Sequence, residues 1–155
     1  MRKGFTLVEL LTVVAIMMVL GLIGVLSLTS KKNSTDLSTT VSEAAALLRE
    51  AESRSTTEAQ GVVWGVHFAN VTNTAPFYAL FSSAYAPTAT ISYYRLPSDI
   101  AYATATLPVG STTNIIFNQV SGLPVAAVQI GFVSLSQKSL PSSTISVTTS
   151  GAVTY

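Results

Sequence analysis

The hydrophobic positions divide the chain into three stretches with different spacing. From residue 5 to residue 29 apolar residues follow one another closely, and Glu9 is the single charge among them. From residue 36 to residue 59 they recur every three or four positions, which predicts a helix with one apolar stripe. That stripe consists of Leu37, Val41, Ala44, Ala45 and Leu48. After residue 60 short β-rich runs alternate with Gly, Pro, Asn and Ser clusters, which predicts strands and turns.

The β-rich runs define the predicted fold class. They cover residues 61–69, 77–83, 91–96, 100–107, 113–117, 125–135 and 144–150. Because no further crossover helix is predicted between them, we expect antiparallel strands with short connections. The sheet would cover the apolar stripe of the preceding helix. The class is therefore α+β, with a long N-terminal helix packed by its second half on an antiparallel sheet. The loop at residues 82–90 is expected to be a variable surface.

Two forms of the helical region fit the pattern. If the helix breaks at the polar sequence SKKNST, Asp36 would cap a second helix. If it does not break, residues 5–59 form one helix of roughly 80 Å. In both forms Glu43, Glu50 and Glu52 would lie on a solvated face, and Glu50 and Arg54 have the favourable i, i+4 order for an ion pair.

The first apolar stretch is long enough to cross a bilayer as a helix, because about twenty residues suffice. Arg2 and Lys3 precede it and would keep the N-terminus in the cytoplasm while the rest of the chain is exported. A secretory signal peptide would need a shorter apolar core and a small-residue cleavage site, and no clear site of that kind follows here. A plain membrane anchor explains everything except Glu9 and the very short basic leader.

Glu9 needs a partner if it lies in lipid, where an acid costs on the order of 2–3 kcal/mol. If the chain were cut after Gly4, Phe5 would become the N-terminus. Its α-amino group would then lie about one helical turn from Glu9. In an assembly, the amine of one subunit could meet Glu9 of a neighbour, and such a pair in low dielectric could set the register between them.

The leader MRKG, followed by FTLVELLTVVAI, closely resembles the signal of type IV pilins and type II secretion pseudopilins. The resemblance implies that a prepilin peptidase cuts after Gly4 and methylates Phe5, and that Glu9 takes part in subunit assembly. Arg2 and Lys3 supply the charge of the leader. The implied partners are the peptidase, other pilin or pseudopilin subunits, the assembly platform of the inner membrane, and lipid.

The same resemblance implies a division of the chain and a location. Residues 1–4 would be the leader, residues 5–30 the transmembrane and assembly helix, and residues 31–155 an exported pilin-like domain. The protein would be a single-pass protein of the cytoplasmic membrane before it enters a pilus or pseudopilus. Many major pilins have a proline near the end of the apolar stretch. This chain has none before Pro76, so the resemblance does not imply a kinked helix.

The second half of the chain resembles a narrower group. The order LREAESRS, GVVWGVHF, FYALFSS, IIFNQVSGLP and TISVTTSGAVTY is similar to that of the GspH/FimT minor pseudopilins. This resemblance implies a minor structural subunit. The alternative is a binding module at the tip of a DNA-uptake or adhesive pilus. A membrane-anchored enzyme is the third class to weigh.

Charge and composition limit these alternatives. From residue 34 onward four bases face six acids, so the exported part is not an electrostatic platform for nucleic acid. The chain has no cysteine, which excludes a disulfide, a thiol nucleophile and a cysteine metal site.

Catalytic motifs are missing as well. His67 is the one histidine, and its strand context favours an exposed or hydrogen-bonded position. Serines and Asp99 could complete a Ser-His-Asp set, but no nucleophile-elbow motif supports one. No phosphate loop, EF-hand loop or histidine metal pair appears. We therefore predict no catalytic residue, metal or cofactor, and a protein that is not an enzyme. Asn33 and Asn70 begin glycosylation sequons that chance produces often.

Overall fold

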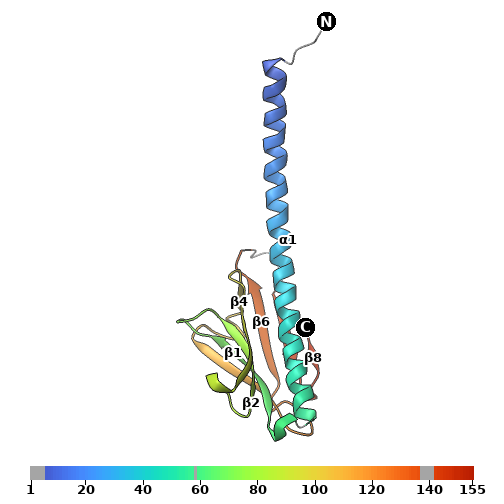
Figure 1. The fold of residues 1–155 in the computed structure, drawn as a ribbon, viewed down its shortest axis with the longest axis vertical. Coiled ribbons are helices and arrows are strands. Elements are labelled where there is room, and N and C mark those ends of the chain that lie inside the picture. Colours follow the sequence, from blue (N-terminus) through green and yellow to red (C-terminus); the bar gives the residue numbers. More distant parts are fainter. Residues whose placement is uncertain (1–5, 58, 137–141) are drawn as a thin grey trace.

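One long helix organises the molecule. The computed structural model describes residues 6–57, 59–136 and 142–155, and gives the backbone alone for residues 23–34 and 59. Helix α1 (Leu7–Thr56) has 50 residues, which at 1.5 Å per residue span about 75 Å. Its N-terminal half stands clear of the rest of the chain (Figure 1). The helix does not break at residues 30–35, so Asp36 lies inside it and does not cap a second helix.

The rest of the described chain is β-rich. Its strands are β1 (Trp64–Asn70), β2 (Phe77–Ser82), β3 (Thr90–Arg95), β4 (Ile100–Tyr102), β5 (Ser111–Phe117), β6 (Val128–Ser134), β7 (Ser143–Val147) and β8 (Val153–Thr154). There are also two single 3-10 turns: η1 (Ala59–Gly61) lies between α1 and β1, and η2 (Pro87–Ala89) lies between β2 and β3. Each predicted run contains a strand. The run at 100–107 is extended only over its first three residues, and the two-residue strand β8 was not predicted.

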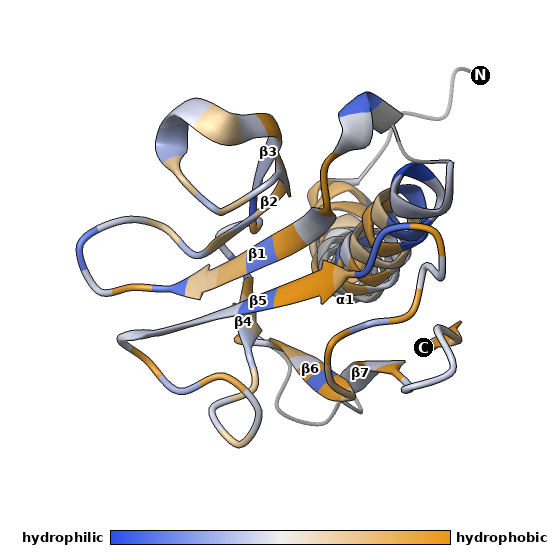
Figure 2. Ribbon diagram, turned by 90° about the horizontal axis from the view of Figure 1, so that it is seen from below, coloured by the Kyte–Doolittle hydropathy of each residue, from blue (hydrophilic) through white to orange (hydrophobic). Residues whose placement is uncertain are grey.

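These strands pair antiparallel in two sheets, whereas a single sheet was expected. The orders are β3-β2-β1-β5 and β4-β6-β7-β8. Figure 2 looks along α1 and shows β1 and β5 on one side of the helix, with β6 and β7 on another. The α+β class with a helix on antiparallel strands is confirmed, and α1 contacts both sheets.

The predicted apolar stripe is the face of α1 that packs on the sheets. Its members are at most 7% exposed, and they are Leu37, Val41, Ala44, Ala45 and Leu48. Large side chains from both sheets meet this stripe, with Trp64 and Phe117 from the first sheet and Phe132 from the second. Burial of each large apolar side chain contributes about 1.5–3 kcal/mol, so this shared core holds the two sheets on one helix.

The C-terminal end of α1 is joined to the first sheet by Ser55. Its hydroxyl donates to the backbone carbonyl of Phe117 (3.1 Å) and accepts from the backbone N–H of Trp64 (3.1 Å). Because Ser55 is fully buried, one hydroxyl satisfies backbone groups of both β1 and β5. Nearby, Arg54 pairs with Glu50 (2.7 Å), which confirms the predicted i, i+4 ion pair.

We predict that Ser55→Ala lowers the free energy of unfolding by about 1–3 kcal/mol, because two buried backbone groups lose a hydrogen-bond partner. Ser53→Ala is the matched control: Ser53 is exposed in the same turn, and its loss is expected to stay within about 0.5 kcal/mol. Urea unfolding of the full chain in detergent, followed by the fluorescence of the single tryptophan, Trp64, measures both. Equal losses in the two variants would contradict this role of the Ser55 hydroxyl.

Candidate assembly surface

Thr6 defines the N-terminal end of α1. It is the N-cap residue, with an extended backbone, and its hydroxyl accepts a hydrogen bond from the N–H of Glu9 (3.3 Å). The carbonyl of Thr6 accepts from the N–H groups of Glu9 (3.1 Å) and Leu10 (3.2 Å). Glu9 therefore lies in the first turn, where a negative charge interacts favourably with the helix dipole. The sequence-based prediction misses Thr6, although the T-x-x-E spacing of a capping box signals it.

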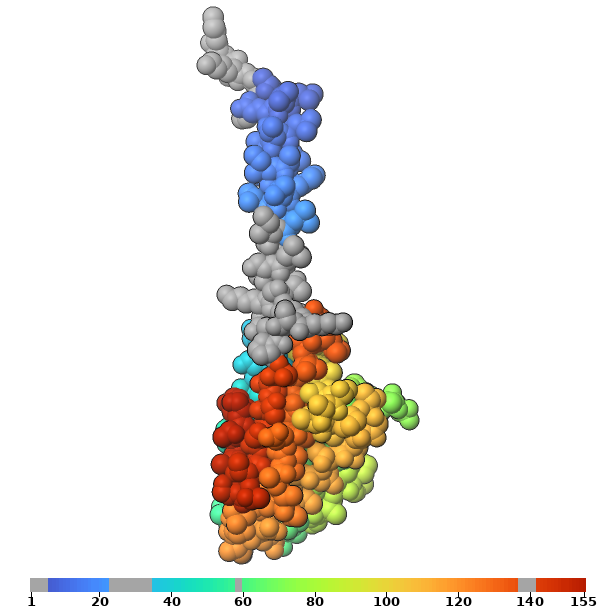
Figure 3. All heavy atoms as spheres, turned by 180° about the vertical axis from the view of Figure 1, so that it is seen from behind, coloured from blue at the N-terminus to red at the C-terminus, as the bar shows by residue number. Residues whose placement is uncertain are grey.

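The helix around Glu9 is apolar on all sides and has no packing partner among the described residues. Large apolar side chains between residues 7 and 22 are 42–79% exposed. They are Leu7, Val8, Leu10, Leu11, Val13, Val14, Ile16, Met17, Met18, Val19, Leu20 and Leu22. Figure 3 shows this segment in blue, well away from the folded domain. A helix that is apolar all round is typical of one that other apolar material surrounds.

The structure places only one of the predicted site residues. Glu9 lies in the first turn of α1, while Arg2, Lys3, Gly4 and Phe5 lie outside the described residues. The pairing between the Phe5 amine and Glu9 therefore stays a prediction. Among the described residues, no helix has an apolar stretch of the length that crossing a membrane requires.

One polar contact lies between the packed half of α1 and the first sheet. The Tyr78 hydroxyl donates to the Glu43 carboxylate (3.3 Å), and its ring stacks on Tyr94 with centroids 5.4 Å apart. Burial, reinforced by the negative charge of Glu43, raises the pKa of Tyr78, so the hydroxyl stays a donor. Glu43, predicted to lie on a solvated face, is exposed but also has this structural role.

His67 is hydrogen-bonded in β1, one of the two positions expected for it. Its Nδ1 lies 2.6 Å from Oδ1 of Asn114, and the ring of Tyr85 stacks on its imidazole with centroids 3.5 Å apart. Tyr85 belongs to the loop after β2, so this loop partly covers the first sheet and leaves His67 only 5% exposed. Burial lowers the pKa of His67, and the hydrogen bond to Asn114 opposes that shift.

Asp99 has different neighbours. Its carboxylate accepts hydrogen bonds from Ser134 (3.1 Å) and Ser136, and its carbonyl accepts one from the N–H of Leu135 (2.8 Å). These contacts join the segment before β4 to the end of β6. The described partners of His67 and Asp99 thus lie in different sheets, and the described residues do not form the Ser-His-Asp set.

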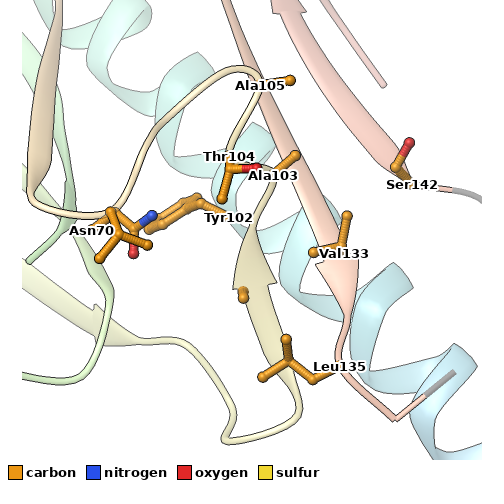
Figure 4. Close-up of a pocket in the computed structure, with 10 residues that line it drawn as sticks. Asn70, Tyr102, Ala103, Thr104, Ala105, Val133, Leu135 and Ser142 are labelled. Carbon is orange, nitrogen blue, oxygen red and sulfur yellow. The ribbon is translucent and has the colours of Figure 1, made fainter. Parts of the chain in front are cut away.

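A cavity of about 420 Å³ opens beside β4 (Figure 4). Its wall is mostly small and apolar, and its buried polar groups are engaged elsewhere. Nδ2 of Asn70 donates to the carbonyl of Leu107 (2.8 Å), and the Tyr102 hydroxyl donates to that of Phe77 (2.7 Å). The described lining therefore suits an apolar guest, and its two buried polar side chains are not free to act as a general acid or base. Buried Asn70 is also a poor glycosylation acceptor in the folded chain, and the side chain of Asn33 is not among those described.

The fold defines a general class of protein. It is a folded domain with a long helix whose N-terminal half is apolar, exposed and capped at its start. Residues 1–25 match the family model described as the prokaryotic N-terminal methylation motif. The chain thus carries a type IV pilin-like prepilin signal, which implies processing by a prepilin peptidase and assembly with other pilin-type subunits. No curated protein and no solved structure matches the chain. The narrower resemblance to GspH/FimT proteins stays a prediction.

The lowered pKa of His67 predicts a pH-dependent stability. The unfolded chain binds a proton near the ordinary pKa of 6.5 more readily than the folded chain does. The stability contribution is therefore full above about pH 6.5 and is lost as the pH falls through the lower pKa of the folded state. Urea unfolding at several pH values should show a smaller loss toward acid for His67→Gln than for the unchanged chain. If the free energy of unfolding fell equally with pH in both chains, the lowered pKa of His67 would be contradicted.

Two expected roles of Glu9 can be separated by substitution. If its charge pairs with an amine during assembly, Glu9→Val and Glu9→Gln should both be processed, yet enter filaments about tenfold less or worse. If Glu9 mainly caps α1, Glu9→Gln should assemble normally, because glutamine also serves in a capping box. Thr6→Ala removes the cap and keeps the charge, so it is expected to assemble. An immunoblot of purified filaments measures how much of each variant they contain, and so distinguishes the two roles.

Proposed function

We propose that this protein is a structural subunit of a type IV pilus or a type II secretion pseudopilus. A prepilin peptidase would cut it after Gly4 and methylate Phe5, and the mature chain would then be built into the filament. The observation that carries the proposal is the methylation motif at residues 1–25. This motif includes the exposed apolar end of α1. In this role the chain performs no chemistry and is itself a substrate of the peptidase.

Before assembly, residues 5–30 would hold the chain in the cytoplasmic membrane, with residues 31–155 exported. The continuous apolar run from residue 5 to residue 29 supports this topology, as do the two basic residues ahead of it. On assembly the same side chains would exchange lipid for the helices of neighbouring subunits. The high exposure of the large apolar side chains at residues 7–22 fits both environments, because both are apolar.

Cleavage would give Glu9 its partner. Once residues 1–4 are removed, the amine of Phe5 would directly precede Thr6, the N-cap of α1, and would be about one helical turn from Glu9. In a bundle of such helices the amine of one subunit can meet Glu9 of the next. A buried acid without a partner is strongly unfavourable, so this pair would select the register in which both charges are satisfied.

The folded domain would then lie on the outside of the filament, held there by the continuous α1. The order of motifs after residue 48 supports a minor subunit of the GspH/FimT type. Besides the peptidase and lipid, the partners would be other pilin-type subunits and the inner-membrane assembly platform. The excess of acids over bases from residue 34 onward disfavours the alternative of a DNA-binding tip module.

Expression of the full chain with and without a prepilin peptidase tests the proposal. With the enzyme, intact-mass analysis should show a chain that begins at Phe5 and carries one additional methyl group. Without it, the chain should retain Arg2, Lys3 and Gly4. Gly4→Val is the control, because a bulky residue before the cut should block processing. An identical, unmethylated N-terminus with and without the enzyme would overturn the proposal.

A further inference from the structure

Strand β3 forms one edge of the first sheet (Figure 2). The N–H of Leu96, just after β3, donates to the carbonyl of Pro76, just before β2 (2.9 Å). Because antiparallel bonds alternate along a strand, Tyr94 also directs its backbone groups toward β2, whereas Tyr93 and Arg95 direct theirs away from it. The N–H and carbonyl groups of these two residues therefore face outward, where another strand can pair with them.

The other edges of the two sheets offer less to a partner. Strands β4 and β8 have three and two residues. The edge of β5 is partly covered by the segment after it, because the N–H of Val125 donates to the carbonyl of Ile116 (3.0 Å). Val120 anchors that segment to α1: its φ is +66°, and its N–H donates to the carbonyl of Ser55 (3.2 Å). Among the described segments none is bonded to the outer side of β3, which with six residues is the longest uncovered edge.

The two faces of β3 carry different chemistry. On the face away from α1, Tyr93 is 46% exposed, and its ring centroid lies 4.7 Å from that of Phe77. The guanidinium of Arg95 lies 5.9 Å from the centroid of the same Tyr93 ring. On the face toward α1, Tyr94 is 42% exposed and stacks on Tyr78. The outer face of this edge is therefore aromatic and positively charged, while the inner face opens toward α1.

A hollow of about 230 Å³ lies between Tyr94 and α1, beside this edge. Its volume is below the roughly 300–1,000 Å³ of sites for small molecules, so it suits a single side chain. Glu50 on its wall pairs with Arg54 (2.7 Å), whereas Glu43 has no cationic partner among the described residues and accepts from the Tyr78 hydroxyl. One negative charge is thus left unmatched there. The helix lines the hollow with Glu43, Ala46, Leu47 and Glu50.

We propose that the edge of β3 binds an extended segment of another protein, with one lysine or arginine of that segment in the hollow. The segment adds to the first sheet as a further strand and pairs with the outward backbone groups of Tyr93 and Arg95. Its alternate residues point to opposite faces. Those on the inner face pass Tyr94 and include the base that meets Glu43. Those on the outer face are apolar and cover Tyr93.

Charge selects which face of the segment meets α1. The stem of a lysine lies along Ala46 and Leu47 while its ammonium group reaches Glu43. If the segment slipped by one residue, the same base would lie beside Arg95, where like charges repel. The partner is therefore a strand in which one base alternates with apolar residues. The inference uses the folded domain alone, and goes beyond the proposed function without resting on it.

A synthetic peptide tests the inference. The probe is acetyl-TVKVTVT-amide, which has valines on one face and a lysine among threonines on the other, and it is titrated into the full chain in detergent with isotope-labelled tyrosine. By NMR, the amide of Tyr93 should shift and exchange more slowly with solvent, because it gains a hydrogen bond. The exchange rate of the Tyr94 amide should not change, because that amide is already bonded to β2. No change at Tyr93 with millimolar peptide, or equal slowing at both amides, would overturn the inference.

Two further peptides test the backbone pairing and the direction of the lysine. The peptide TVKPTVT should not bind, because proline interrupts the hydrogen-bond ladder. The peptide TKTVTVV has the composition of the probe but places the lysine on the valine face, so it should bind about three- to fivefold more weakly. Binding of either peptide as tight as that of the probe would contradict the proposed pairing.

Matched variants of the chain test the hollow. Glu43→Gln keeps an acceptor for the Tyr78 hydroxyl, and it should weaken binding of the probe about three- to fivefold. It should leave the affinity for TVTVTVT, which lacks the lysine, unchanged. Glu52→Gln is the control, because nine residues further along α1 it lies on the opposite side of the helix. An equal effect of Glu43→Gln on both peptides, or an equal effect of Glu52→Gln on the probe, would overturn the inference.

Discussion

The structure depends on one continuous helix whose two halves suit two different environments. Over residues 35–56 α1 has a single apolar stripe, and two sheets bury it. Toward its N-terminus α1 is apolar all round and packs on nothing in the described part of the chain. Because no break separates the two parts, whatever fixes the free end also fixes the position of the domain. Ser55 completes this connection, since its buried hydroxyl joins the last turn of α1 to two strands.

Local spacing explains why much of the fold was predictable. Leu37, Val41 and Leu48 recur at helical intervals, so the packed face of α1 could be assigned before the structure was known. The division into two sheets was not predictable, because strand pairing depends on partners far apart in the chain. Strand β8 is too short to leave a pattern. The sequence does not decide whether α1 continues through SKKNST, because polar residues suit both a helix surface and a break.

Some residues of the candidate site have a signal in the sequence, whereas the loop conformations do not. Glu9 stands out because a single acid interrupts an apolar run, and Thr6 could have been found from the capping-box spacing. The stack of Tyr85 on His67 and the left-handed backbone of Val120 carry no sequence signal. Both result from loops whose conformation is set by the elements they touch, in one case the first sheet and in the other the end of α1.

The central claim is that α1 builds this chain into a filament by its exposed, processed end. The most direct test is to isolate surface filaments or pseudopili from the native cell and to sequence their subunits by mass spectrometry. The account predicts that this chain is present and that its N-terminal peptide begins at methylated Phe5. Its absence from the filaments, or its presence there with residues 1–4 retained, would contradict the account.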